Sequence, residues 1–174
     1  MNKHKLILIV GSSGAGKTTL AEMLAKERDC AFLSEDDFIF TMNPKTMIAR
    51  APRKQDRVLG MKSLWASLQV YLRAGRSVVV EGALVDGPYY LEDFRKLAEV
   101  YDYEFIPLLL KGSVQKRRDR KIRQGYAVPR VVDLRLRRSA EQLGYPEECD
   151  VIDTTKRRTK RQNLAEIDQV IDTN

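Results

Sequence analysis

An α/β protein with a five-stranded, mainly parallel sheet flanked by helices is predicted from three observations. Short apolar runs alternate along the chain with longer amphipathic stretches. The short runs are continuously apolar, which is typical of strands buried on both faces of a parallel sheet. The chain has 174 residues, 43% of them hydrophobic and 32% charged, enough for one compact core and too few for two ordinary domains. We therefore expect a single domain over residues 1–174.

Five segments have the composition of buried strands. The first, residues 5–10, reads KLILIV and comes directly before a glycine. The third, residues 77–80, contains three consecutive valines. The remaining strands are expected at residues 30–33, 103–110 and 151–152.

Helices are expected between these strands. Within residues 55–74 the apolar side chains recur at the i, i+3, i+4, i+7 spacing of a core-facing helix, and Gly75 is placed to end it. Further helices are expected at residues 17–28, 90–101, 114–123, 129–143 and 163–171.

Several classes of protein are excluded by the scarcity of cysteine and histidine. Cys30 and Cys149 lie far apart without CxxC spacing, and His4 is the one histidine. These counts exclude a zinc finger, a disulfide framework and a mechanism that needs paired histidines. The apolar runs are shorter than the roughly 20 residues that span a bilayer, and none resembles a secretory signal. We expect a cytoplasmic protein without a membrane partner.

The net charge of +7 is unevenly distributed. Residues 111–161 carry 16 Lys and Arg against 7 Asp and Glu, whereas residues 1–110 are nearly balanced. Apolar side chains are spread through this basic block, so it is not a disordered tail. It is either a solvated, salt-bridged helical face or a surface that binds phosphates of nucleotide or nucleic acid.

The most specific motif lies between the first strand and the following helix. Residues 11–18 read GSSGAGKT and fit the pattern GxxxxGK[ST] at every position. The glycines let the backbone wrap a phosphate, and the start of the next helix adds partial positive charge. Lys17 can reach the β- and γ-phosphates, and the Thr18 hydroxyl can ligate Mg²⁺. The predicted contacts of a nucleoside triphosphate are Gly11, Ser12, Ser13, Gly14, Ala15, Gly16, Lys17, Thr18 and Thr19.

Acidic residues follow the second strand. The segment 34–38 reads SEDDF, and in a doubly wound sheet it faces the same crevice as the phosphate-binding loop. Asp36 or Asp37 can take the proton of an attacking hydroxyl or hold a water of Mg²⁺. A structural alternative, compatible with this role, is a helix start in which Ser34 and Asp37 form a capping box.

A further acid, Glu81, follows the three valines of the third strand. It can orient a metal-bound water or bind the substrate, or it can be a strand-end acid paired with a nearby Lys or Arg. The loop after it, residues 82–88, is placed to line an acceptor site.

An arginine-rich segment follows the fourth strand. Residues 116–125 read KRRDRKIRQG, within a lid expected over about residues 112–130. Phosphoryl transfer depends on positioning and on neutralising charge at the transferred group, which arginines on a closing segment supply. Arg118, Arg120 and Arg123 are the candidates for phosphate contact.

The order of these parts resembles the small P-loop kinases, and most closely the polynucleotide 5′-kinase group among AAA-type P-loop proteins. The resemblance implies a nucleoside-monophosphate-kinase-like fold and transfer of the γ-phosphate of ATP·Mg²⁺ to a hydroxyl group. In that group the first of two aspartates before an aromatic residue is the general base, which here is Asp36. The arginine before an Ala-Val-Pro stretch contacts the γ-phosphate, which here is Arg123. Arg118 resembles the arginine that packs on adenine.

Other features resemble metabolite kinases of the gluconate, shikimate and adenylylsulfate type, and antibiotic phosphotransferases. These features are the pair Glu81 and Gly82, and the segment 151–155, which reads VIDTT. In those families the corresponding segment lines the adenine pocket. Ile39 and Phe40 stand where the polynucleotide kinases often have an arginine for the acceptor phosphate. Three hypotheses follow: a kinase of nucleic acid 5′-hydroxyls or nucleotides, a kinase of a small metabolite, and a non-catalytic nucleotide-gated binding module.

Overall fold

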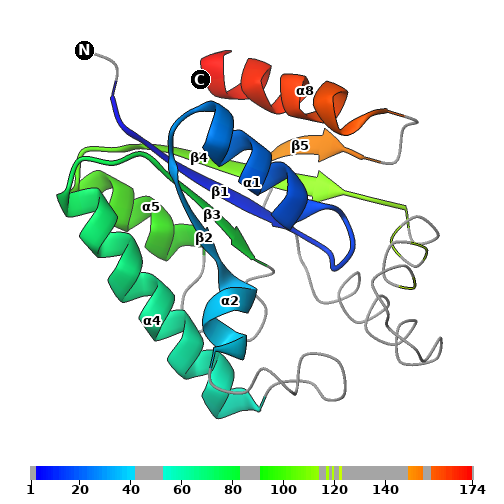
Figure 1. Ribbon diagram of the computed structural model, residues 1–174. Coiled ribbons are helices and arrows are strands. Elements are labelled where there is room, and N and C mark those ends of the chain that lie inside the picture. The colour runs from blue at the N-terminus through cyan, green and yellow to red at the C-terminus, as the bar shows by residue number, and fades with distance from the viewer. Residues whose placement is uncertain are drawn as a thin grey trace.

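In the computed structural model of the protein, one five-stranded sheet is covered by helices on both faces (Figure 1). The strand order is β2-β3-β1-β4-β5, and every pairing is parallel. The strands are β1 Lys5–Gly11, β2 Ala31–Ser34, β3 Val78–Gly82, β4 Glu104–Lys111 and β5 Asp150–Asp153. The helices are α1 Lys17–Glu27, α2 Glu35–Phe40, α4 Lys54–Arg73, α5 Leu91–Val100 and α8 Lys160–Thr173. The structure describes residues 3–41, 53–82, 91–113, 149–154 and 158–173, with 117, 119 and 122.

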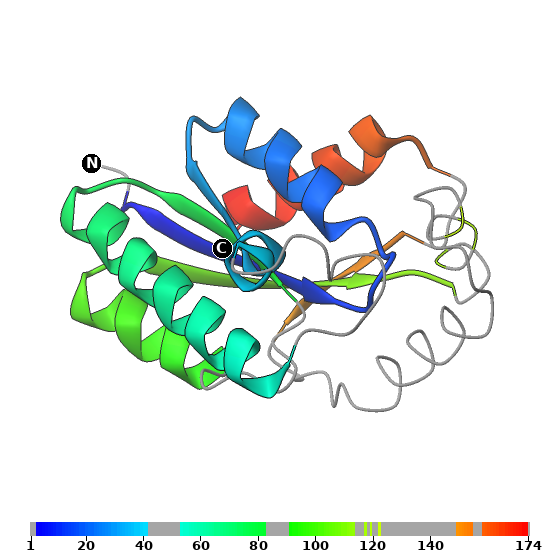
Figure 2. The ribbon, with the colours of Figure 1, turned by 60° about the horizontal axis from the view of Figure 1, so that its bottom comes forward.

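Two apolar layers hold the helices to the sheet. Ile7 and Ile9 of β1 face the layer formed with α1 and α8, whereas Leu6 and Leu8 face the layer formed with α4 and α5. Figure 2 shows α1 and α8 on one side of the sheet and α4 and α5 on the other. All four of these β1 side chains are 0% exposed. This confirms the prediction that the continuous apolar run is a strand buried on both faces.

The C-terminal helix α8 is fastened to α1 by charged side chains. The Arg28 Nε donates a hydrogen bond to Asp168 Oδ1 at 2.7 Å, and its Nη2 donates to Asp172 Oδ1 at 2.8 Å. Lys5 Nζ also donates to the carbonyl oxygen of Ile171 at 2.8 Å. Because α8 follows β5, these contacts help to hold β5 at the edge of the sheet.

The strands and helices predicted within the described residues agree with the structure, with one informative difference at the end of β3. Gly75 ends α4 with φ +65°, as predicted for a glycine after the helix. β3 continues past the predicted end at residue 80, because Glu81 and Gly82 pair with Ile9 and Val10 of β1. The helices predicted at 114–123 and 129–143 lie outside the described residues, except that residues 117, 119 and 122 are helical.

The short helix α2 is held against α4 by a close backbone approach. A Cβ on Gly60 of α4 would lie 2.8 Å from the Cα of Ile39 in α2. Gly60 is therefore required for the two helices to touch. Since α2 follows β2 without an intervening loop, α4 and the sheet together fix where the acids of α2 lie.

No helix in the described part of the chain is both long enough and apolar enough to cross a membrane.

Candidate active site

The loop between β1 and α1 has the backbone that its sequence predicts. Gly11, Gly14 and Gly16 adopt φ values of +146°, +79° and +101°. A Cβ on Gly11 would lie 2.4 Å from the carbonyl oxygen of Leu110. Positive φ and close contact together exclude a larger residue, so these glycines serve the loop conformation itself.

The start of α1 is suited to an anion. Gly16 is the N-cap residue and has no side chain to cap the helix, and the first turn contains no acid. The first backbone N–H groups of a helix lack intrahelical partners and carry partial positive charge, so they favour an external anion. Lys17 is the first residue of the helix, which adds a full positive charge at the same place.

Glu81 connects the phosphate-binding loop with the end of β2. Its Oε1 accepts a hydrogen bond from Thr18 Oγ1 at 3.1 Å and another from Ser34 Oγ at 2.6 Å. Glu81 is buried, with 2% of its surface exposed. Because the Thr18 proton is directed at Glu81, the lone pairs of the Thr18 oxygen can face a cation. The arrangement fits a magnesium site that Thr18 would ligate and Glu81 would orient.

The predicted capping box at the start of α2 is wrong. Ser34 is the N-cap residue, but it makes no side-chain cap hydrogen bond. Its hydroxyl donates to Glu81 instead. A hydrogen bond to a buried carboxylate is about twice as strong as one between neutral groups, which explains the preference.

Glu35 is another buried acid, where β2 and β3 end. The sequence analysis did not single out this residue. It is 6% exposed, and a Cβ on Gly82 would lie 2.4 Å from its Oε2. Gly82 therefore makes room for the Glu35 side chain. The sequence signal was the glycine directly after Glu81 in an otherwise valine-rich strand.

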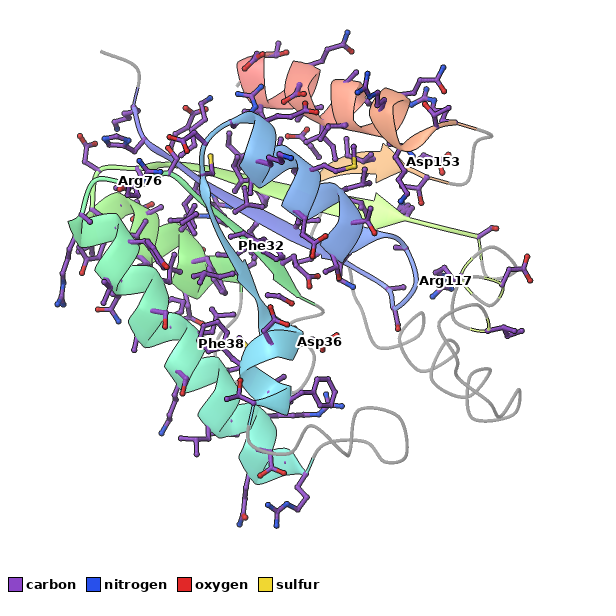
Figure 3. All side chains as sticks on the ribbon, viewed as in Figure 1. Phe32, Asp36, Phe38, Arg76, Arg117 and Asp153 are labelled. Atoms are coloured by element: carbon purple, nitrogen blue, oxygen red, sulfur yellow. The ribbon has the colours of Figure 1, made fainter. Side chains whose placement is uncertain are left out.

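Asp36 and Asp37 lie in the first turn of α2, and both are exposed. Figure 3 shows Asp36 at the start of this helix, next to the edge of the sheet where β2 ends. The structure thus joins Thr18, Ser34 and Glu81 by hydrogen bonds and leaves the two aspartates at the surface beside them.

The lid arginines Arg118, Arg120 and Arg123 lie outside the described residues. Their neighbour Arg117 is described and is 3% exposed. A Cβ on Gly14 would lie 2.9 Å from the Arg117 carbonyl oxygen, so this residue packs directly against the phosphate-binding loop. The sequence analysis missed Arg117, because its place in a run of charges gave no sign of burial.

Comparison with known proteins identifies related kinases. A gluconokinase from Arabidopsis thaliana is 28% identical over 159 residues, which are 85% of this chain and 82% of that protein. The solved structure of a putative kinase from Chloroflexus aurantiacus has a TM-score of 0.71 at 22% identity, covering 99% of this chain and 98% of that one. The APS kinase of Mycobacterium tuberculosis, solved with AMPPNP and APS, has a TM-score of 0.64 at 17% identity, covering 99% of each chain.

The two structural likenesses confirm the predicted fold of a P-loop kinase, with its parallel sheet flanked by helices. A family model described as an AAA domain matches residues 6–143, from β1 through the arginine-rich segment. The match covers most of the chain and includes the phosphate-binding loop. The chain therefore belongs to this AAA-domain family and is a P-loop kinase, an enzyme that transfers a phosphoryl group.

Proposed function

We propose that the protein transfers the γ-phosphate of ATP·Mg²⁺ to a hydroxyl group of a small metabolite. The observation that carries the choice of acceptor is the 28% identity to a gluconokinase over 82% of that enzyme. Gluconate, shikimate and adenylylsulfate share a small, anionic, hydroxyl-bearing structure, and an acceptor of this class is the one we favour.

The other acceptor class considered from the sequence is the 5′-hydroxyl of a polynucleotide or a nucleotide. It was supported by the basic block at residues 111–161. The relatives described above are named for small-metabolite substrates where a substrate is given, and none is named as a polynucleotide kinase. We therefore assign the basic block to ATP phosphates and to the solvated surface of the lid.

Each candidate residue has a distinct role in this proposal. Lys17 and the backbone N–H groups of residues 11–19 bind the phosphates of ATP. Asp36 accepts the proton of the acceptor hydroxyl. The hydroxyl oxygen bonds to the γ-phosphorus, and the bond between that phosphorus and ADP breaks. Thr18 would hold Mg²⁺, with Glu81 orienting the site and with Asp36 facing a water of the ion. Mg²⁺, when bound, neutralises charge on the phosphates.

The proposal also gives roles to the arginines of the lid and to one residue that contacts the acceptor. In this proposal Arg120 and Arg123 contact the transferred phosphate, and Arg118 packs on adenine. Asp37 is a candidate for contact with the acceptor.

The acceptor class is tested by transfer of labelled γ-phosphate from ATP·Mg²⁺ to separate substrates. The substrates are gluconate, shikimate, adenylylsulfate, a panel of other sugar acids and hydroxylated antibiotics, nucleoside monophosphates, and 5′-hydroxyl DNA and RNA oligomers. We expect label on a small metabolite and none on the oligomers. The Lys17→Ala protein, purified in parallel, reports any contaminating kinase. Label on oligomers alone would overturn the proposed acceptor, and no label on any substrate would favour the binding module.

Glu81→Gln should raise the Mg²⁺ concentration needed for half-maximal rate by about tenfold, because residues that orient metal ligands typically contribute 10- to 100-fold in affinity. The substitution keeps an acceptor for Thr18 and Ser34 but removes the negative charge. The measurement is the initial rate against free Mg²⁺ at saturating ATP, with Glu22→Gln on the exposed face of α1 as the matched control. An unchanged Mg²⁺ requirement together with a higher KM for the acceptor would instead assign Glu81 to the substrate.

A further inference from the structure

Four segments of the chain meet beneath the phosphate-binding loop, around Gly112. A Cβ on Gly112 would lie 3.2 Å from Arg117 Cγ, 3.3 Å from Thr154 Oγ1 and 3.4 Å from Ala15 Cα. The loop, the start of the arginine-rich segment and the residue after β5 therefore all lie close to Gly112 at the end of β4. Figure 3 shows Arg117 and Asp153, which precedes Thr154, at this end of the sheet.

Thr154 joins these segments through hydrogen bonds to two carbonyl groups. Its Oγ1 lies 3.2 Å from the carbonyl oxygen of Ala15 and 2.8 Å from that of Lys111, and donates to both in a three-centre hydrogen bond. Its backbone N–H also donates to the Lys111 carbonyl at 2.8 Å. Thr154 is 2% exposed, so this hydroxyl is shielded from water. The end of β5 is thereby joined to the loop through a side chain and to β4 through its backbone.

The contact with Ala15 shows which way one peptide group of the loop faces. The carbonyl of Ala15 and the N–H of Gly16 belong to the same planar, trans peptide unit, and they point in opposite directions. Because the carbonyl is directed at buried Thr154, the Gly16 N–H is directed away from the protein interior. That is the side from which a phosphate approaches the start of α1.

We propose that Thr154 is a positioning residue for the phosphates of ATP, acting through the Ala15–Gly16 peptide. Its hydroxyl holds the Ala15 carbonyl on the inner side of the loop and so keeps the Gly16 N–H aimed at the nucleotide. The inference rests on the proposed binding of ATP at this loop and is independent of the acceptor.

The contribution of Thr154 should be seen in binding of the phosphate chain. Without the hydroxyl, the Ala15 carbonyl loses this buried hydrogen bond, and part of the binding energy is spent on holding the peptide in the orientation that binds phosphate. The loss of one buried hydrogen bond corresponds to about a tenfold change in affinity. The effect should be equal for ATP and for tripolyphosphate, which has no adenosine.

The test compares Thr154→Val, which removes the hydroxyl and keeps the shape, with Thr154→Ser, which keeps the hydroxyl. We expect Thr154→Val to raise the Kd of ATP and of tripolyphosphate, measured by calorimetry with Mg²⁺, about tenfold. Its KM for ATP should rise while kcat stays within about threefold, because the contact serves ground state and transition state alike. Thr154→Ser should stay within about twofold of the wild-type Kd. If the valine protein does not fold, Thr154→Ala takes its place with the same expected values.

Tyr103→Phe is the control that separates a specific loss of ligand binding from a general loss of stability. The Tyr103 hydroxyl is also buried and donates to two carbonyls, those of Leu72 at 3.0 Å and Arg76 at 3.1 Å, at the opposite end of β4. This variant should lower Tm without changing the Kd of either ligand.

Three results would overturn the proposal. An unchanged Kd in Thr154→Val would mean that the hydroxyl serves Lys111 alone. An equal loss in Thr154→Ser would assign the effect to packing of the methyl group. A loss for ATP without a loss for tripolyphosphate would place Thr154 on the adenosine side. None of these results depends on which acceptor the enzyme uses, so they are distinct from a failure of the acceptor assignment.

Discussion

Lys17→Ala is expected to lower kcat/KM for phosphoryl transfer by about 10³-fold or more, because in the proposed site it removes a positive charge that stabilises the transferred phosphate. Lys17 is the first residue of α1 and follows the three glycines with positive φ. The neighbouring N–H groups remain in the variant, so ATP should still bind, more weakly. The effect on kcat should therefore exceed the effect on Kd.

The matched control is Lys26→Ala, which removes the same side chain from the exposed last turn of the same helix. Rates under saturating ATP and Kd values for ATP are measured for both variants. The control should retain the wild-type rate and bind ATP normally. A Lys17→Ala enzyme with more than about a tenth of the wild-type rate would contradict the assignment of ATP to this loop, given the size expected for a lost charged contact.

Most of the fold could be predicted from the sequence because its signals are local. Residues 6–10 are continuously apolar, and the structure buries them between two helical layers. Gly75 was expected to end a helix and does so with positive φ. The GxxxxGK[ST] pattern fixed the place of the phosphate-binding loop. Each of these features depends on a few neighbouring residues.

The features that the sequence did not predict all depend on contacts between distant segments. Ser34 is a residue type typical of helix caps, yet its hydroxyl donates a hydrogen bond to the carboxylate of Glu81, 47 positions away. Thr154 reaches Ala15 across 139 positions. Arg117 is buried against Gly14 although it stands within a run of charges. Such pairings follow from the sheet topology, which local patterns do not specify to the level of single side chains.

The choice between Asp36 and Asp37 also depends on the fold. Glu35 and Ile39 are the buried residues of α2, against Gly82 and Gly60 respectively. Each helical residue advances by about 100°, so Asp36 lies about 100° from Glu35 and Asp37 lies about 160° from it. Asp37 therefore faces away from the sheet, whereas Asp36 flanks the edge where β2 and β3 end. This geometry supports Asp36 as the general base.

Asp36→Asn is accordingly expected to lower kcat by about 10²-fold or more while the Kd of ATP stays within about twofold, since general-base catalysis typically contributes 10² to 10⁴. Asp37→Asn is the comparison at saturating acceptor, because it removes the same charge from the same helical turn. Since Asp37 is the candidate for acceptor contact, its variant should raise the KM for the acceptor. Single-turnover rates at saturating ATP and acceptor, together with ATP binding, separate chemistry from affinity. Asp37→Asn should keep most of its rate. A larger loss in Asp37→Asn would transfer the role to Asp37, and equal small losses would mean that neither carboxylate takes the proton.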